Sequence, residues 1–205
     1  MFQKFYPDVY VESAYAIDYE SLYADGYRGL IFDIDNTLVT HGAPATPRAT
    51  ALFARLKEIG FSCCFISNND EARVKMFNEE IGVEYTYKAH KPSADGYLRA
   101  MEKMGTNRDN TIMIGDQIFT DIRGANRAGI PSIMVRNIWW IEKFQIFLKR
   151  FPEVFILQCY RSYRIAHKTT ARGAFFARGD DVSRYFLRGH ARTIEDKENP
   201  VRRKP

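Results

Sequence analysis

The chain has 205 residues, of which 45% are hydrophobic and 27% charged. This ordinary globular composition and length suit one domain with an appendage, and they exclude collagen-like and wholly disordered classes. No run of 18 apolar residues and no apolar leader occurs, so we predict neither a membrane span nor a signal peptide. The three cysteines fit neither a disulfide framework nor a zinc site, which favours the reducing cytoplasm.

The net charge of +5 is unevenly distributed along the chain. Residues 161–205 contain 12 basic and 5 acidic residues, a net charge of +7, and the remainder therefore carries −2. A basic segment suits an anionic partner such as nucleic acid or a lipid surface, although a solvated tail is the more frequent interpretation. Because its hydrophobic residues follow no sustained period, we predict that 151–205 form a basic, disordered tail.

Regular elements are predicted from near the N-terminus onward. Residues 1–28 form an aromatic-rich extension, with a short helix from the N-cap Asp18 to Gly26, and we expect it to pack against the edge of the next domain. Strands and helices then alternate, with strands at 29–34, 61–67, 83–87, 111–116 and 130–136, and helices at 47–60, 70–82, 93–104, 119–128 and 138–150. Thr46 and Ser93 are predicted to cap two of these helices. Five alternations predict an α/β fold with a five-stranded parallel sheet.

Polar side chains follow the first four strands at the point where each strand ends. The carboxyl ends of parallel strands share one edge of a sheet, where open α/β sheets bind ligands. We therefore expect two acids, a hydroxyl, a lysine and two further acids to converge there: Asp33, Asp35, Ser67, Lys91, Asp116 and Asp121. Such a set suits a metal ion and an anion.

These residue types also suit phosphoryl transfer. One carboxylate can attack phosphorus and form an aspartyl-phosphate, and a second can protonate the leaving oxygen and later activate water. A lysine and a hydroxyl can hold the phosphoryl oxygens. Mg²⁺ prefers carboxylate and phosphate oxygens, and it screens the attacking acid from the anion that this acid must approach.

Four motifs occur in one order along the chain: Asp33-Ile-Asp35-Asn-Thr37, Ser67-Asn68-Asn69, Lys91-Pro92 and Gly115-Asp116-Gln117-Ile-Phe-Thr-Asp121. A single such motif is a weak signal, whereas four in order are a strong one. Over about residues 1–150 the chain resembles the haloacid dehalogenase-like (HAD) phosphatase superfamily, and more closely the YqeG-type branch of its subfamily IIIA. The resemblance implies a Rossmannoid three-layer sandwich and a Mg²⁺-dependent phosphomonoesterase.

The resemblance also implies a role for each motif residue. Asp33 would be the nucleophile and Asp35 the general acid and base. Mg²⁺ would bind the Asp33 and Asp116 side chains and the main-chain carbonyl of Asp35, and Asp121 would stand behind these ligands because the helix turn sets it further back. The residues expected to bind the phosphate are Thr37, Ser67, Asn68 and Lys91.

The spacing of the motifs leaves no room for a cap domain. Asp33 and Ser67 are 34 positions apart, and Ser67 and Lys91 are 24 apart, and the predicted helices and strands already fill both intervals. We therefore divide the chain into an N-terminal extension (1–28), an uncapped phosphatase domain (29–150) and the tail (151–205). An uncapped site can admit a phosphate carried on a large body.

Three functions are compatible with these features. The first is hydrolysis of a lipid-borne phosphate, and the resemblance points to phosphatidylglycerophosphate. The aromatic or basic segments 1–27 and 138–151 would then contact the inner face of the membrane peripherally, although Trp139 and Trp140 suit core packing better than a membrane belt. The second is a soluble phosphatase of a sugar, nucleotide or nucleic-acid phosphate. The third is a catalytically idle protein with a nucleic-acid-binding tail, but the intact residue set argues against it. The sequence fixes neither the substrate nor the oligomeric state.

Overall fold

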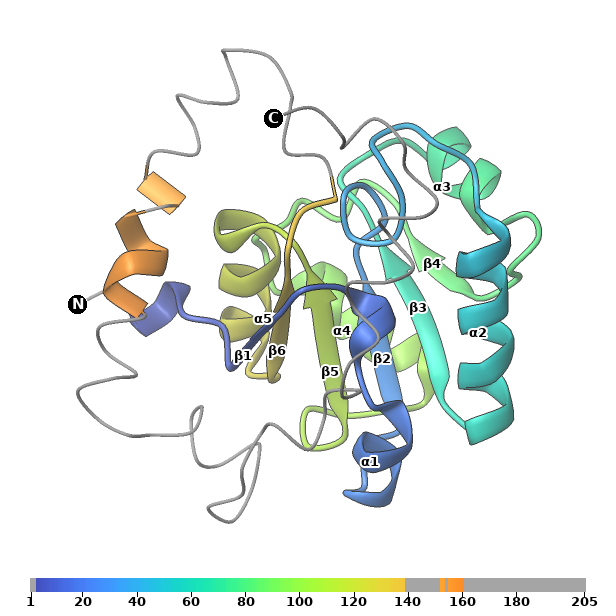
Figure 1. The fold of residues 1–205 in the computed structure, drawn as a ribbon, viewed down its shortest axis with the longest axis horizontal. Helices are drawn as coiled ribbons and strands as arrows, with labels where there is room; N and C mark the ends of the chain where they lie inside the picture. Colours follow the sequence, from blue (N-terminus) through green and yellow to red (C-terminus); the bar gives the residue numbers. More distant parts are fainter. Residues whose placement is uncertain (1–2, 139–151, 154, 161–205) are drawn as a thin grey trace, which may run out of the picture.

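The computed structural model describes residues 3–138, 152–153 and 155–160. A parallel sheet forms its centre, with the strand order β1-β6-β5-β2-β3-β4 (Figure 1). The strands are β1 (Val9–Val11), β2 (Gly29–Phe32), β3 (Ser62–Ile66), β4 (Glu84–Thr86), β5 (Thr111–Gly115) and β6 (Ser132–Val135). The helices are α1 (Tyr19–Ala24), α2 (Pro47–Ile59), α3 (Glu71–Asn78), α4 (Asp95–Met104) and α5 (Arg123–Ala128).

Helices cover both faces of the sheet, because successive strand residues point to opposite sides. Leu30 in β2 belongs to the larger core cluster, which α1, α2 and α3 complete. Ile31, the next residue, belongs to a second cluster that α4 and α5 complete on the other face. The prediction of a three-layer α/β sandwich is therefore confirmed, and it explains why the strands read as continuous apolar runs.

The helix starts mostly follow the predicted capping residues. Asp18, Thr46 and Asp70 each accept a hydrogen bond from the backbone N–H three residues further on, which fixes the starts of α1, α2 and α3. The prediction for Ser93 needs a correction. Helix α4 begins at Asp95, and the Ser93 hydroxyl accepts only a long, 3.4 Å hydrogen bond from the Asp95 N–H.

The sheet has six strands, so the predicted number of five is wrong. The additional strand, β1, lies at the edge of the sheet and pairs in parallel with β6, more than 120 residues away. The Asp8 carboxylate fixes this pairing, because it accepts hydrogen bonds from the Ser132 N–H (2.8 Å) and hydroxyl (3.2 Å). Three residues are too short a run to show a period in the sequence, so only the long-range pairing identifies this strand.

The connections between strands contain no cap domain. Between residues 29 and 138, all of which the structure describes, each crossover holds only helical structure and connecting loops, the longest of which, 33–46, joins β2 to α2. The connection after β5 differs in detail from the prediction of one helix over 119–128. It begins as a π-helical turn, Ile118–Ile122, which continues into α5. Single π-helical turns inside helices are uncommon, and they often occur at functional sites.

The end of the described chain packs back on the domain. Residues 152–153 and 155–160 are helical, and Ile156 contacts the cluster of Ile118, Ile122 and Met134. Part of the segment predicted to be a disordered tail is thus folded. The predictions for 161–205, for Trp139 and Trp140, and for most of the helix at 138–150 lie outside the described residues. Within those that are described, no helix has the length and hydropathy needed to cross a bilayer.

Candidate active site

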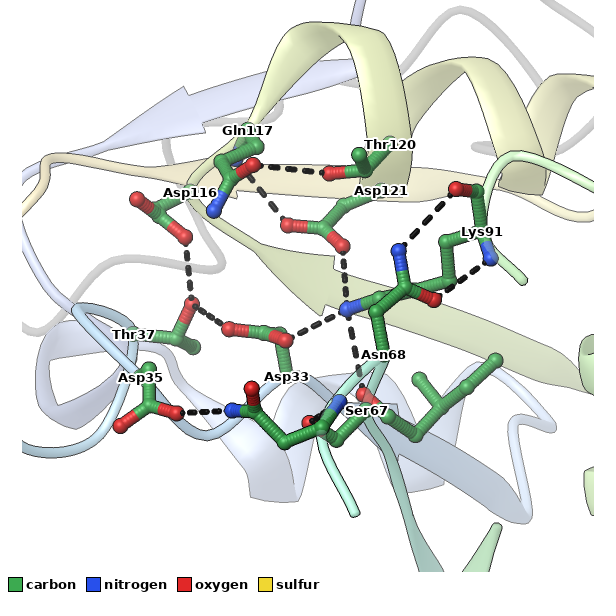
Figure 2. A network of polar contacts seen from close by, with 12 residues as sticks. Asp33, Asp35, Thr37, Ser67, Asn68, Lys91, Asp116, Gln117, Thr120 and Asp121 are labelled. Atoms are coloured by element: carbon green, nitrogen blue, oxygen red, sulfur yellow. Dashed lines mark hydrogen bonds and ion pairs between the residues drawn. The ribbon is translucent and has the colours of Figure 1, made fainter. Parts of the chain in front are cut away.

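The carboxyl ends of the central strands bring together the side chains that the sequence predicted to converge. Asp33 follows β2, Ser67 follows β3 and Asp116 follows β5, and Lys91 enters from the loop that follows β4 (Figure 2). Hydrogen bonds and ion pairs connect Asp33, Asp116 and Lys91, together with Thr37 and Asp121, into one network. The parallel register explains the convergence, since it places β5 and β3 on either side of β2.

Asp33 lies at the centre of this network and is 6% exposed. One carboxylate oxygen forms an ion pair with the Lys91 ammonium group, and the other lies 3.5 Å from the Thr37 hydroxyl. Burial raises the pKa of Asp33 to about 7, because Lys91 only partly offsets the burial and the nearby charge of Asp121 adds to it. The single positive charge of Lys91 is therefore not enough to offset the burial of Asp33 and the charge of Asp121.

Lys91 connects the two sides of the network and is itself buried. In addition to Asp33, its ammonium group donates to Asp121 Oδ1 (2.8 Å) and to the main-chain carbonyl of Ile66 (3.1 Å). Burial alone would lower the pKa of Lys91, but the charges of Asp121 and Asp33 outweigh burial and hold the pKa above its ordinary value. Lys91 is thus a fixed positive charge at the end of β3.

Asp116 faces Asp33 across the Thr37 hydroxyl, which lies 3.3 Å from Asp116 Oδ1 and can donate to only one of the two acids at a time. The Asn137 amide donates to the other Asp116 oxygen at 2.7 Å. Burial, followed by the charges of Asp33 and Asp121, raises the pKa of Asp116 well above its usual value. A second acid in this cluster therefore also lacks positive charge.

Asp121 lies closer to the cluster than expected and is fully buried. The π-helical turn carries it back toward β5, where its Oδ2 accepts a hydrogen bond from the Gln117 N–H at 3.0 Å. Gly115 makes room for it, because a Cβ at that position would come within 2.6 Å of the Asp121 carboxyl carbon. Asp121 therefore depends on a residue without a side chain at the end of β5.

Asp35 has a different environment, although it is only two residues from Asp33. Its carboxylate accepts hydrogen bonds from the Gly42 N–H (2.8 Å), the Asn69 amide (2.7 Å) and the Arg73 guanidinium (2.7 Å). The His41 ring nitrogen lies 3.8 Å away on a largely exposed side chain. Donors therefore surround Asp35, whereas other acids crowd Asp33.

Ser67 and Asn68 lie on the loop between β3 and α3 (Figure 2). The Ser67 hydroxyl accepts a hydrogen bond from the Asn69 N–H at 3.1 Å. The Asn68 amide bonds the main chain of Lys91 twice, accepting from its N–H at 2.7 Å and donating to its carbonyl at 3.1 Å. Asn68 thereby fixes the loop that carries Lys91.

Three buried acids form a candidate cation site. Asp33, Asp116 and Asp121 each offer a carboxylate oxygen, and these oxygens lie within 4.8 Å of one another. Lys91 supplies one positive charge against three carboxylates, which leaves the cluster short of positive charge. The donor set, all hard oxygen, suits Mg²⁺. The Asp35 side chain points to its own donors instead.

Three residues of the site were not assigned a role from the sequence. Asn69 and Arg73 hold Asp35, and Asn137 holds Asp116. Asn137 could have been found, because it follows the last strand at the same sheet edge. Asn69 belongs to a motif that was noted, but Arg73 lies inside a helix, where no spacing rule marks it.

Comparisons with known proteins show which family this chain is similar to. Residues 40–129 match the haloacid dehalogenase-like hydrolase family. The chain is 41% identical over 137 residues to the "Probable phosphatase YqeG" of Bacillus subtilis (strain 168), an alignment that covers 66% of this chain and 80% of that relative.

Two further relatives come from photosynthetic eukaryotes. The chain is 29% identical over 172 residues to the "Phosphatidylglycerophosphate phosphatase 1, chloroplastic/mitochondrial" of Arabidopsis thaliana, covering 78% of this chain and 46% of that one. It is 27% identical over 162 residues to the "Phosphatidylglycerophosphate phosphatase 1, chloroplastic" of Chlamydomonas reinhardtii, covering 73% and 60%. The chain thus spans less than two thirds of the length of these two relatives.

Proposed function

This chain belongs to the haloacid dehalogenase-like hydrolases, among which it is a YqeG-type phosphomonoesterase, and we propose that Asp33 carries the phosphoryl group through the reaction. The observation that supports this assignment most is the environment of Asp33. It is buried, paired with Lys91 and within reach of Asp116 and Asp121, so an incoming cation would supply the positive charge that it lacks.

In the first proposed step, an Asp33 oxygen forms a bond to phosphorus while the bond between phosphorus and the leaving alkoxide oxygen breaks. Lys91 and the hydroxyls of Thr37 and Ser67 hold the phosphoryl oxygens, with Asn68 fixing the Lys91 loop. Asp35 gives its proton to the leaving oxygen. The products are the alcohol and an aspartyl-phosphate on Asp33.

In the second proposed step, Asp35 removes a proton from water, and the water oxygen attacks the phosphorus of the aspartyl-phosphate. The bond between phosphorus and Asp33 breaks, which restores the Asp33 carboxylate and releases inorganic phosphate. Asp35 holds a proton again at the end of the cycle. Each acid thus acts twice, Asp33 as nucleophile and then leaving group, Asp35 as acid and then base.

We also propose Mg²⁺ as the cofactor. The Asp33 and Asp116 carboxylates and the Asp35 carbonyl would hold it, with Asp121 beside them in the same cluster. Bound there, Mg²⁺ would neutralise charge on the phosphoryl oxygens and on the attacking carboxylate. The raised pKa values of Asp33 and Asp116 support this assignment, because they mark a cluster whose ionised form needs a cation.

For the substrate we propose a lipid-borne phosphate, and specifically phosphatidylglycerophosphate. Two relatives bear that activity in their names, and the absence of a cap between residues 29 and 138 leaves room for a bulky lipid. We further propose that the protein works in the cytoplasm, at the inner face of the membrane. A soluble sugar or nucleotide phosphate is the competing substrate class.

A substrate panel tests this proposal. Phosphate release is measured from phosphatidylglycerophosphate in mixed micelles and from sugar phosphates and nucleotides, with Mg²⁺ and with a chelator. We expect Mg²⁺-dependent release that favours the lipid and that disappears in Asp33→Asn, with folding checked by circular dichroism. Equal or faster turnover of the soluble esters would replace the lipid by a soluble substrate, and release by Asp33→Asn would refute the role of Asp33.

A further inference from the structure

Arg73 has a second feature besides its contact with Asp35. One terminal nitrogen of its guanidinium donates to Asp35 Oδ1 at 2.7 Å, but the Nε and the other terminal nitrogen are buried and have no hydrogen-bond partner among the residues that the structure describes. The side chain as a whole is 12% exposed. An arginine carries five N–H donors, so three of them are left without an acceptor.

Neutralising Asp35 does not account for these free donors. The Gly42 N–H and the Asn69 amide already donate one hydrogen bond to each Asp35 oxygen. A side chain with a single donor would be enough to add the third hydrogen bond that Arg73 makes. Burying charged N–H groups without acceptors destabilises the folded protein. The Phe77 ring, 5.7 Å from the guanidinium carbon, holds the group in place but accepts no conventional hydrogen bond. The arrangement therefore suits a group whose acceptor arrives with a ligand.

The position of Arg73 indicates which part of a substrate it faces. In the proposed mechanism, on which this inference rests, Lys91 holds the phosphoryl oxygens and Asp35 contacts the leaving oxygen. Arg73 binds Asp35 directly and comes from α3, so it lies on the side of the alcohol that departs. An anion on that alcohol would come close to a planar guanidinium, a group whose donors bind phosphate and carboxylate groups well once they face the ligand.

We propose that Arg73 selects substrates whose leaving alcohol carries a second anionic group, such as the phosphodiester of a lipid headgroup. Because Nε and one terminal nitrogen are covered, binding requires the guanidinium to turn toward the incoming anion, which exchanges its bond to Asp35 for bonds to the ligand. Arg73 is thus a specificity-determining residue, distinct from the groups that act on phosphorus.

The test compares two water-soluble substrates with the same phosphomonoester on the same kind of alcohol. Glycerol 3-phosphate has an uncharged leaving group, and glycerophosphoglycerol phosphate, the deacylated headgroup of phosphatidylglycerophosphate, has a leaving group with a phosphodiester. The readout is the ratio of their kcat/KM values, because damage to Asp35 lowers both values and leaves the ratio unchanged. Intact lipid in micelles forms a third arm.

We expect wild type to favour the charged substrate by at least about tenfold, the scale of a hydrogen bond to a charged group. Arg73→Gln should remove most of this preference, and Arg73→Lys should restore part of it, because lysine keeps the charge but not the planar group. Arg55→Gln is the matched control, since it breaks a half-exposed ion pair between α2 and Glu20 of α1.

The outcomes separate this inference from the proposed function. If wild type shows no preference, or Arg73→Gln retains it, Arg73 does not select the substrate, even though lipid hydrolysis stands. If wild type hydrolyses neither glycerophosphoglycerol phosphate nor the intact lipid, the proposed substrate fails and this inference fails with it. If Arg73→Gln does not fold, the wild-type ratio and Arg73→Lys decide.

Discussion

Asp33 and Asp35 lie two positions apart on the same loop, but different kinds of group surround them. Asp33 is next to one lysine and two further acids, Asp116 and Asp121, and burial raises its pKa to about 7. Asp35 accepts hydrogen bonds from a backbone N–H, an amide and a guanidinium. The surroundings of Asp33 lack positive charge, whereas the surroundings of Asp35 are rich in hydrogen-bond donors.

This difference suggests how one residue type can take two roles. A carboxylate among other carboxylates favours a cation, and with the cation in place it can approach a phosphate. A carboxylate held by neutral and cationic donors remains oriented while the substrate changes. Each of the following experiments changes one side of this contrast.

The largest effect on activity is expected when Asp33 or Asp35 is replaced, one at a time, by asparagine. Asp33→Asn should lower kcat by about 10⁴-fold or more, because the nucleophile is lost, and Asp35→Asn by about 10²- to 10⁴-fold, because proton transfer is lost. p-Nitrophenyl phosphate distinguishes them, since its leaving group needs no proton. We expect a burst of p-nitrophenol and a phosphoryl adduct, seen by mass spectrometry, in Asp35→Asn alone. A burst in Asp33→Asn would show that the roles are assigned wrongly.

Removal of the lysine should affect both activity and stability. Lys91→Met leaves Asp33 and Asp121 without their shared cation, so we expect kcat to fall by about 10²- to 10³-fold. Breaking this buried ion pair should also lower the free energy of unfolding by about 3–5 kcal/mol, measured by urea denaturation without added metal. Lys103→Met, at a half-exposed lysine near Glu84, is the control and should change neither quantity appreciably. Equal effects of the two substitutions would contradict a special role for Lys91.

A smaller change tests the placement of Asp121. Gly115→Ala adds a Cβ where the Asp121 carboxyl group lies, 2.6 Å away, so the carboxylate must move within the cluster. We expect the free energy of unfolding to fall by about 1–3 kcal/mol, the usual scale for overpacking. Activity should fall by about tenfold or more, because a small misplacement near reacting groups is costly. Unchanged kinetics at saturating Mg²⁺ would indicate that the position of Asp121 does not matter.

The acid cluster also shows how far sequence reasoning reaches. Asp33, Ser67, Lys91 and Asp116 were predicted to meet because each follows a recognisable strand, and the ends of parallel strands share an edge. Asp121 lies nearer than predicted, because the turn that carries it is π-helical and the glycine that admits it leaves no signal of its own. Their geometry is predictable, whereas their catalytic roles remain proposals.

The hydrogen-bond donors around Asp35 were harder to predict. Arg73 reaches Asp35 from inside α3, and whether it points to the site depends on how the helix is rotated on the sheet. Strand β1 presents the same difficulty, because three residues form a strand only through pairing with β6 at the other end of the domain. Short-range patterns identify strand ends and helix caps, but contacts of this kind require the assembled fold.

A change of pH tests the charge balance of the acid cluster itself. The pKa of Asp33 is raised to about 7, and that of Asp116 is also raised, so without a cation the folded state binds more protons than the unfolded state above about pH 4. The metal-free protein should therefore lose stability as the pH rises from about 4 through 7, the window between the unfolded and folded pKa values of Asp33. A bound cation replaces those protons, so its stabilising effect should grow with pH.

Thermal unfolding with and without Mg²⁺ measures this effect. At a Mg²⁺ concentration of about 100 times Kd, binding adds about 2.7 kcal/mol, or about 5–10 °C in Tm for a chain of this size. We expect such an increment near about pH 8 and a clearly smaller one near about pH 5.5, where protons compete for Asp33 and Asp116. Asp116→Asn should remove most of the increment, because it deletes one carboxylate of the cluster while keeping a side chain of similar size. An increment that is equal at both pH values would place the cation away from these acids, and the contrast between the Asp33 and Asp35 environments would then need another explanation.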